Sequence, residues 1–94
     1  MKFLWDPIKA ENNIKKHGVS FEEAMSAFLD TYARRAYDSE HSTSREDRWI
    51  LLAMSQLARL LVVVHIELNQ STLRIISARK ATKKEMKTYM ELRV

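Results

Sequence analysis

Hydrophobic residues are densest over residues 60–80 (LLVVVHIELNQSTLRIISARK), a stretch that predicts two strands joined by a turn. Its β-branched residues favour a pleated, largely buried surface. Residues 48–55 (RWILLAMS) predict a third strand, which turns at residues 56–58 into this hairpin. Residues 2–5 and 33–38 predict two shorter strands. We therefore expect a small antiparallel sheet built mostly of hairpin connections.

Three segments carry the end signals of helices. Asp6-Pro7 provides an N-cap and a proline at the first helical position, and Gly18 marks the end of that helix. Capping boxes at Ser20–Glu23 and Thr82–Glu85 predict the starts of a second and a third helix. The predicted buried stripes are Phe21, Ala24, Met25 and Phe28 in the second helix and Met86, Tyr89 and Met90 in the third. Two N-terminal helices, a sheet and a C-terminal helix predict an α+β fold.

The period-2 geometry of the central hairpin predicts a polar cluster on one of its faces. If Leu68 and Ser71 flank a two-residue turn, His65 lies opposite Arg74, and Glu67 shares their face. The other face, formed by Val62, Val64, Ile66, Leu73 and Ile75, is then the core. A register shifted by one residue would separate the three polar side chains. A solvated polar rim or a structural ion pair is the alternative to a site with chemistry.

Trp49 is expected beside this cluster. With a three-residue turn at residues 56–58, Trp49 pairs with His65. An aromatic side chain next to such groups can stack on an unpaired base, and plain core packing is the alternative. The three histidines, at positions 17, 41 and 65, lack the spacing of metal ligands, so neither a metal site nor a cofactor is expected.

Composition and length indicate one globular domain spanning residues 1–94. The chain is 46% hydrophobic and 30% charged, which is ordinary for a water-soluble domain. It lacks an apolar run of the ~18 residues that cross a membrane, and its first residues lack the apolar core of a signal peptide. Cysteine is absent, which excludes disulfides and a thiol nucleophile. We expect a cytoplasmic protein without membrane contact.

The positive charge is concentrated at the C-terminal end. Residues 1–78 contain ten Lys or Arg and ten Asp or Glu, whereas residues 79–94 contain six basic and two acidic residues, which gives the net charge of +4. A cationic end on a neutral body predicts contact with a polyanion or an acidic protein. A lysine-rich, solvated helix face is the alternative.

Four motifs together resemble the BrnT family of bacterial type II toxins. They are Phe3-x-Trp5-Asp6, the segment Lys16–Ala24 (KHGVSFEEA), the segment Leu61–Glu67 (LVVVHIE) and the segment Arg74–Thr82 (RIISARKAT). The resemblance implies a RelE-like fold, a ribonuclease that inhibits translation, and a BrnA-like antitoxin. That antitoxin carries a ribbon-helix-helix module, so the toxin reaches DNA only indirectly, through its partner. The chain departs from the pattern in lacking glycine at both hairpin turns.

The polar cluster suits metal-free cleavage of RNA, which needs a base, an acid and a cation for the charged phosphorane. Arg74 is expected to supply the cation, and His65 and Glu67 are assigned jointly to acid–base work. The residues expected to bind RNA are Trp49, Arg79, Lys80, Lys83, Lys84 and Lys87. Anchoring of the last helix is the alternative role of Arg79. A non-catalytic basic module that binds protein or nucleic acid is the alternative function.

Overall fold

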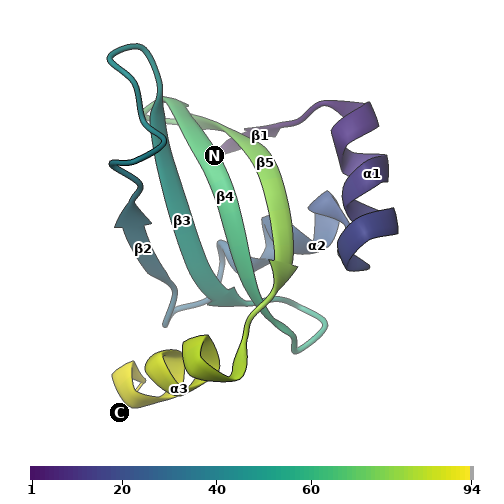
Figure 1. The fold of residues 1–94 in the computed structure, drawn as a ribbon, viewed down its shortest axis with the longest axis vertical. Coiled ribbons are helices and arrows are strands. Elements are labelled where there is room, and N and C mark those ends of the chain that lie inside the picture. The colour runs from purple at the N-terminus through teal and green to yellow at the C-terminus, as the bar shows by residue number, and fades with distance from the viewer. Residues whose placement is uncertain (94) are drawn as a thin grey trace.

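The computed structural model describes residues 1–93, and these form a mixed five-stranded sheet with three helices (Figure 1). In chain order the elements are β1 (Lys2–Leu4), α1 (Pro7–His17), α2 (Phe21–Ala27), β2 (Arg34–Tyr37), β3 (Asp47–Met54), β4 (Leu60–Asn69), β5 (Thr72–Lys80) and α3 (Lys83–Leu92). The strand order in the sheet is β1-β5-β4-β3-β2. The α+β class is confirmed. The sheet is not wholly antiparallel, because β1 pairs with β5 in parallel.

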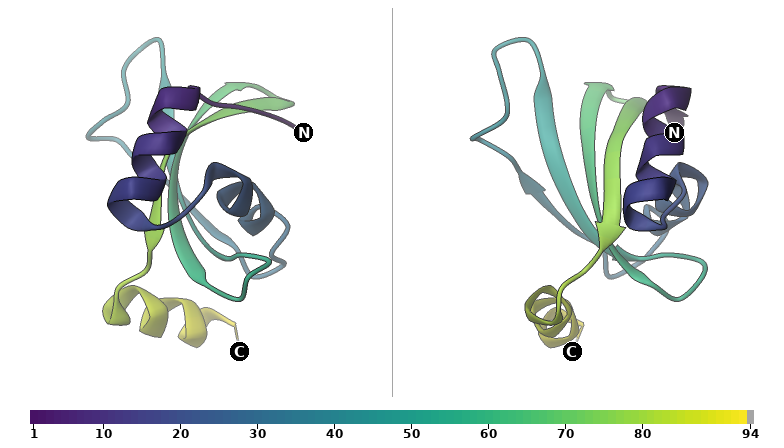
Figure 2. Two further views of the ribbon diagram at one scale, coloured as in Figure 1. Left: turned by 90° about the vertical axis from the view of Figure 1, so that its right-hand side faces the viewer. Right: turned by 45° about the vertical axis from the view of Figure 1, so that its right-hand side comes forward.

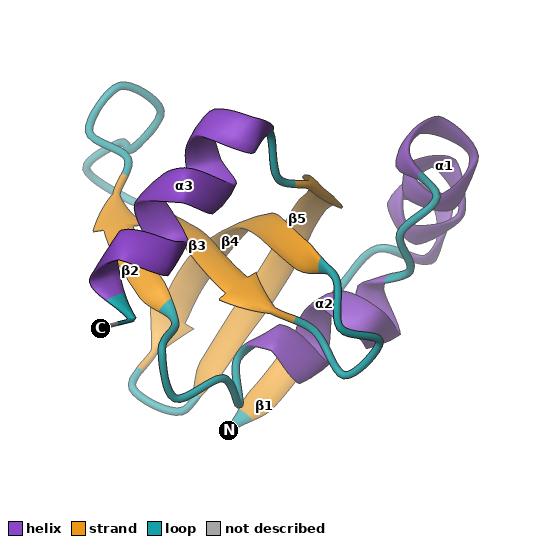
Figure 3. Ribbon diagram, turned by 90° about the horizontal axis from the view of Figure 1, so that it is seen from below, coloured by secondary structure: helices purple, strands orange, loops and turns teal. Residues whose placement is uncertain are grey.

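The sheet separates α3 from the two N-terminal helices (Figures 2 and 3). The main core lies between the sheet and α2, and its buried residues are Val19, Phe21, Ala24, Ala27, Leu51, Ala53, Leu61, Val63, Leu73, Ile75 and Ala78. The face that carries Leu61, Val63 and His65 is therefore the one that α2 covers. Of the five residues predicted to form the core face, Leu73 and Ile75 do lie in this core. Val62, Val64 and Ile66 were assigned to the wrong face, because α2 packs on the other side of the sheet, although Val62 and Ile66 are buried there.

The β4–β5 register differs from the predicted one. Asn69 pairs with Thr72, so the turn residues are Gln70 and Ser71. The side-chain oxygen of Asn69 accepts a hydrogen bond from the Ser71 N–H at 2.9 Å, which starts the turn one residue later than expected. This turn alone would place His65 opposite Ile76, but an irregularity in the pairing between Glu67 and Asn69 moves the register back by one residue. His65 therefore pairs with Ile75, and the predicted pairing of His65 with Arg74 is wrong. The β3–β4 register, by contrast, is as predicted, with Trp49 opposite His65.

A buried amide, and not an apolar stripe, attaches α1 to the sheet. The Asn13 Nδ2 group donates to the carbonyls of Val19 and Ala78, each at 2.8 Å, and Oδ1 accepts from the Ala78 N–H at 3.1 Å. Ile8 and Ile14 on the same helix are exposed. Asn13 thus satisfies the backbone groups of Ala78 on the edge of β5, where β1, which pairs only with Thr72–Arg74, does not reach.

The helix caps and stripes follow the predictions only in part. The capping box at Thr82–Glu85 is confirmed. Ser20 caps α2, but the Glu23 carboxylate is buried and bonds Ser55 and Arg59 instead of closing a second box.

The predicted stripes also include side chains that the structure exposes. Met25 is 37% exposed, Met86 48% and Met90 49%, so these three were wrongly placed in the core. Tyr89 is the buried residue of α3, and its hydroxyl donates to Asp30 at 2.5 Å. No helix described here is long and apolar enough to cross a membrane.

Replacing Asn13 should destabilise the fold strongly. Asn13→Ala leaves one N–H and two carbonyls without their partners in a buried place, and we expect a loss of about 2–4 kcal/mol in the free energy of unfolding. Urea unfolding followed by circular dichroism measures this loss. Asn12→Ala, on the exposed side of the same helix, is the matched control and should change stability by less than ~0.5 kcal/mol. Equal losses in the two variants would contradict the anchoring role.

Candidate active site

Three charged or titratable side chains converge on the helix-covered face of the sheet. Arg35 on β2 pairs with Leu51 on β3, which pairs with Val63 on β4, so the Arg35 side chain points to the face of His65 and Glu67. The Arg35 Nε group donates to His65 Nε2 at 3.1 Å, and its Nη2 group donates to the Glu67 carboxylate at 2.9 Å. A guanidinium therefore bridges an imidazole and a carboxylate.

His65 is completely buried, which fixes its protonation state. Its ring packs edge-on against Phe28, with 4.9 Å between ring centroids. Nδ1 lies 3.2 Å from the Val63 carbonyl oxygen, so the tautomer that satisfies both contacts donates from Nδ1 and accepts from Arg35 at Nε2. Burial first, and the Arg35 charge in addition, lower the pKa of His65 to about 4, against the opposing effects of the Val63 bond and Glu67. The imidazole is neutral at pH 7.

Aromatic side chains hold Arg35 from the other side. The Arg35 guanidinium carbon lies 4.3 Å from the centroid of the Trp49 ring, in a cation–π contact. Tyr37 packs edge-on against Trp49 at 5.1 Å, and its hydroxyl donates to Asp47 at 3.3 Å. Because Arg35 covers one face of Trp49, the predicted stacking of a base on this ring has only the remaining surface available.

Arg74 and Arg79, the two arginines that the sequence predicts to take part in the site, lie away from His65. Arg74 pairs with Ile66 and is exposed on the face opposite His65, where it lines a groove with Asp6 and Lys9. The predicted cluster of His65, Glu67 and Arg74 is thus wrong as geometry, and Arg35 stands where Arg74 was expected.

Arg79 donates to both carboxylate oxygens of Glu85, at 2.8 and 3.0 Å. These bonds lower the pKa of Glu85 to about 2. Arg79 therefore anchors α3, which was one of its two predicted roles.

The predicted RNA-binding lysines are exposed but distant in the fold from this cluster. Lys80 ends β5, and Lys83, Lys84 and Lys87 lie on α3, on the other side of the sheet from His65. No group of three or more His, Cys, Asp or Glu that could hold a metal ion occurs within residues 1–93.

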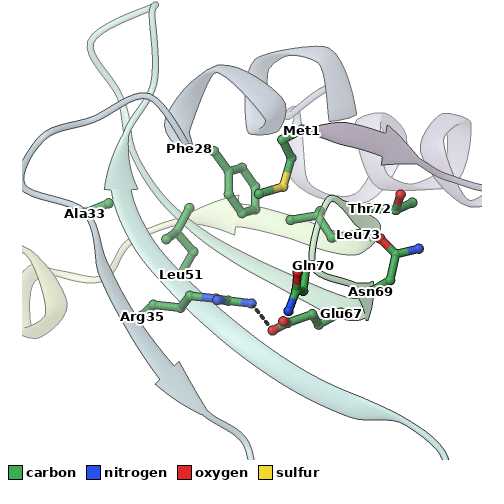
Figure 4. A pocket seen from close by; sticks show the side chains of 10 residues that line it. All are labelled: Met1, Phe28, Ala33, Arg35, Leu51, Glu67, Asn69, Gln70, Thr72 and Leu73. Atoms are coloured by element: carbon green, nitrogen blue, oxygen red, sulfur yellow. Dashed lines mark hydrogen bonds and ion pairs between the residues drawn. The ribbon is translucent and has the colours of Figure 1, made fainter.

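A cavity of about 290 Å³ adjoins the cluster (Figure 4). Arg35 and Glu67 form part of its wall, and Phe28, Leu51 and Leu73 contribute apolar surface. The β4–β5 turn closes it with polar side chains. The bridged pair of charges is therefore accessible from a pocket large enough for a small planar group.

Arg35 is the member of this cluster that the sequence did not predict. The Arg34–Arg35 pair was visible, but the long polar loop between Tyr37 and Asp47 conceals the register of β2 with β3. One signal could have found it: placing Tyr37 opposite Trp49 aligns two aromatics and turns Arg35, not Arg34, toward His65.

Comparison with known proteins identifies the family. Residues 5–85 match the family described as "Ribonuclease toxin, BrnT, of type II toxin-antitoxin system". The chain belongs to the BrnT family. It is thus a ribonuclease toxin, with RNA as its substrate and an antitoxin as its partner. The predicted family and activity are confirmed.

A solved structure shares the fold. The 1.1 Å crystal structure of the Brucella abortus ribonuclease toxin, BrnT, is similar with a TM-score of 0.58 and 24% sequence identity. The match covers 88% of this chain and 99% of the Brucella chain. No curated protein matches the sequence.

Acid should lower the free energy of unfolding by protonating the buried His65 imidazole. The folded-state pKa of about 4 lies below the ordinary value of 6.5, so the unfolded chain binds a proton more readily between these values. The stability that neutral His65 contributes is complete above pH 6.5 and is lost as the pH falls toward 4. At pH 4.5 we expect a loss of roughly 2–3 kcal/mol relative to pH 7.

His65→Gln cannot be protonated and should lack this part of the acid sensitivity. Urea unfolding of both proteins at pH 7 and pH 4.5 measures the difference. The exposed His41 gives the matched variant His41→Gln, which should behave as the unmodified protein does. The same acid sensitivity in His65→Gln and the unmodified protein would show that His65 titrates normally.

Proposed function

We propose that RNA is cleaved at the cluster of Arg35, His65 and Glu67, by protein side chains and without a metal ion. The observation that supports this proposal is the guanidinium bridge, in which Arg35 contacts both His65 Nε2 and the Glu67 carboxylate. A cation that can grip phosphate oxygens, a neutral imidazole and a carboxylate are the groups that RNA cleavage by the 2′-hydroxyl requires.

In the first step Arg35 exchanges its contacts with His65 and Glu67 for contacts with a phosphate group of the RNA. Its side chain is 39% exposed, and a phosphate group offers it two oxygens in place of Glu67 and His65. When Arg35 turns to the phosphate, Nε2 of His65 loses the donor that occupies its lone pair. The positive charge beside the imidazole is then neutralised, which raises the pKa of His65. Substrate binding thus frees the Nε2 lone pair of His65 and makes the imidazole a stronger base.

The chemical step then proceeds by proton transfer through His65. Nε2 takes the proton of the ribose 2′-hydroxyl while the 2′-oxygen bonds to phosphorus and the bond from phosphorus to the 5′-oxygen breaks. Arg35 stabilises the charge on the phosphorane, and Glu67 stabilises the imidazolium. The imidazolium returns the proton to the leaving 5′-oxygen. The products are a 2′,3′-cyclic phosphate and a 5′-hydroxyl.

The cellular role follows from this activity. We propose that the toxin acts in the cytoplasm, that cleavage of RNA inhibits translation, and that the partner is a BrnA-like ribbon-helix-helix antitoxin. Contact with DNA is then made by the antitoxin.

The antitoxin is proposed to contact α3. The exposed Lys83, Lys84 and Lys87 stand there beside the half-exposed Met86 and Met90. Cationic and flexible apolar side chains together suit an acidic amphipathic segment.

Loss of Arg35 should abolish toxicity while loss of its neighbour should not. Arg35→Ala removes the phosphate ligand, and we expect RNA cleavage to fall by about 10²–10³-fold, with relief of growth arrest in bacteria. Arg34→Ala is the matched control, because Arg34 points to the opposite face of the same strand. Arg74→Ala should also remain toxic. A folded, fully active Arg35→Ala protein, or an inactive Arg74→Ala protein, would contradict the proposed site.

Removing the α3 lysines should weaken the complex with the antitoxin. In the triple variant Lys83→Gln, Lys84→Gln, Lys87→Gln the helix keeps its Arg79–Glu85 anchor, so we expect an unchanged fold. Association with the purified antitoxin should become slower and less dependent on salt, while RNA cleavage stays unchanged. Stopped-flow association at two salt concentrations measures this effect. A drop in RNA affinity with an unchanged antitoxin complex would instead assign the lysines to RNA.

A further inference from the structure

The cavity beside the cluster differs in character from the cluster itself. It measures about 290 Å³, near the lower limit of ~300 Å³ for small-molecule sites, so it fits one small group and not an extended strand. Phe28, Leu51 and Leu73 give it apolar walls, and the Arg35–Glu67 pair forms the side that it shares with the proposed site. A group bound here would lie directly beside a phosphate held by Arg35.

Gln70 lines the cavity, and its side-chain amide can form hydrogen bonds with the polar edge of a bound group. Gln70 stands at the first turn position of the β4–β5 hairpin, and its side chain lines the cavity beside Glu67 (Figure 4). The contact drawn between the lining residues in Figure 4 joins Arg35 to Glu67, and none joins Gln70 to the others. The amide offers one acceptor oxygen and two donor hydrogens.

The neighbouring Asn69, which also lines the cavity, fixes the turn that carries this amide. The Asn69 side-chain oxygen accepts from the Ser71 N–H at 2.9 Å and from its hydroxyl at 3.2 Å. These bonds hold the turn in the shifted register, and that register places Gln70 in the first turn position. Gln70 is thus positioned by a local structure that does not depend on a ligand.

We propose that this cavity binds one unpaired nucleobase of the RNA, next to the scissile phosphate, and that Gln70 determines which base is accepted. A nucleobase is planar, with apolar faces for the walls of Phe28, Leu51 and Leu73 and a polar edge for the amide. The inference rests on the proposed function, because Arg35 and Glu67 belong both to the cavity and to the catalytic cluster. It adds the part of the substrate that sets sequence preference.

Cleavage of a random single-stranded RNA pool tests the role of Gln70. Sequencing of the cut ends should show a base preference at one of the two positions that flank the cut. Gln70→Ala should reduce that preference about tenfold, with a smaller change in the total rate, because one base contact is lost while the catalytic groups stay. Gln56→Ala, in the other exposed hairpin turn, is the matched control and should keep the preference. An unchanged preference in Gln70→Ala would overturn the inference.

A binding measurement separates this inference from the catalytic proposal. The Gln70 side-chain amide signals of His65→Gln, followed by NMR, should shift on addition of at least one of the four ribonucleoside 3′-monophosphates. Ribose 5-phosphate, which has no base, should leave them unshifted. Absence of a shift with all four nucleotides, or an equal shift with the baseless sugar phosphate, overturns the inference whatever the cleavage result. An active His65→Gln protein contradicts the catalytic proposal alone.

Discussion

The guanidinium of Arg35 holds together the cluster at which we propose that RNA is cleaved. It donates to a buried imidazole and to a half-exposed carboxylate, and it rests on the ring of Trp49. These contacts join β2, β3 and β4 at one place. The cluster therefore forms only if the three strands keep their observed register. Because a neutral His65 accepts from Arg35, burial of the imidazole leaves no unpaired charge in the core.

The cluster of Arg35, His65 and Glu67 lies at the border of the small core. His65 contacts Phe28 at the end of α2, and the same face continues into the buried residues Leu61 and Val63. The proposed catalytic groups are thereby fixed on strands that carry the core, where packing holds side chains more firmly than in a loop. The Asn13 bonds to the end of β5 and the Arg79–Glu85 pair fasten the helices at sites away from this face.

The sequence predicts the elements well and the polar partners poorly, for identifiable reasons. The pairing of Trp49 with His65 follows from the three-residue turn, in which Ala58 adopts the left-handed conformation at φ 58° in place of a glycine. The predicted β4–β5 pairing fails for two local reasons: the side-chain bond of Asn69 holds the turn one residue later, and the pairing is irregular between Glu67 and Asn69. Together they place Ile75, and not Arg74, opposite His65. Arg35 stayed hidden because its register depends on a long loop without periodicity. Hydrophobic patterns set the faces of a sheet, whereas single hydrogen bonds in turns decide which polar residues meet.

Titration of His65 by ¹⁵N NMR of the imidazole tests most directly whether burial and the Arg35 contact together keep this ring neutral, and whether a phosphate that draws Arg35 away raises its pKa. In the free protein we expect the Nδ1–H tautomer and a neutral ring down to about pH 4. Addition of a 2′-O-methyl RNA, which binds but cannot be cleaved, should raise the pKa of His65. A ring whose pKa lies near the ordinary value of 6.5, or does not respond to the RNA, would contradict the proposed role of Arg35 and His65.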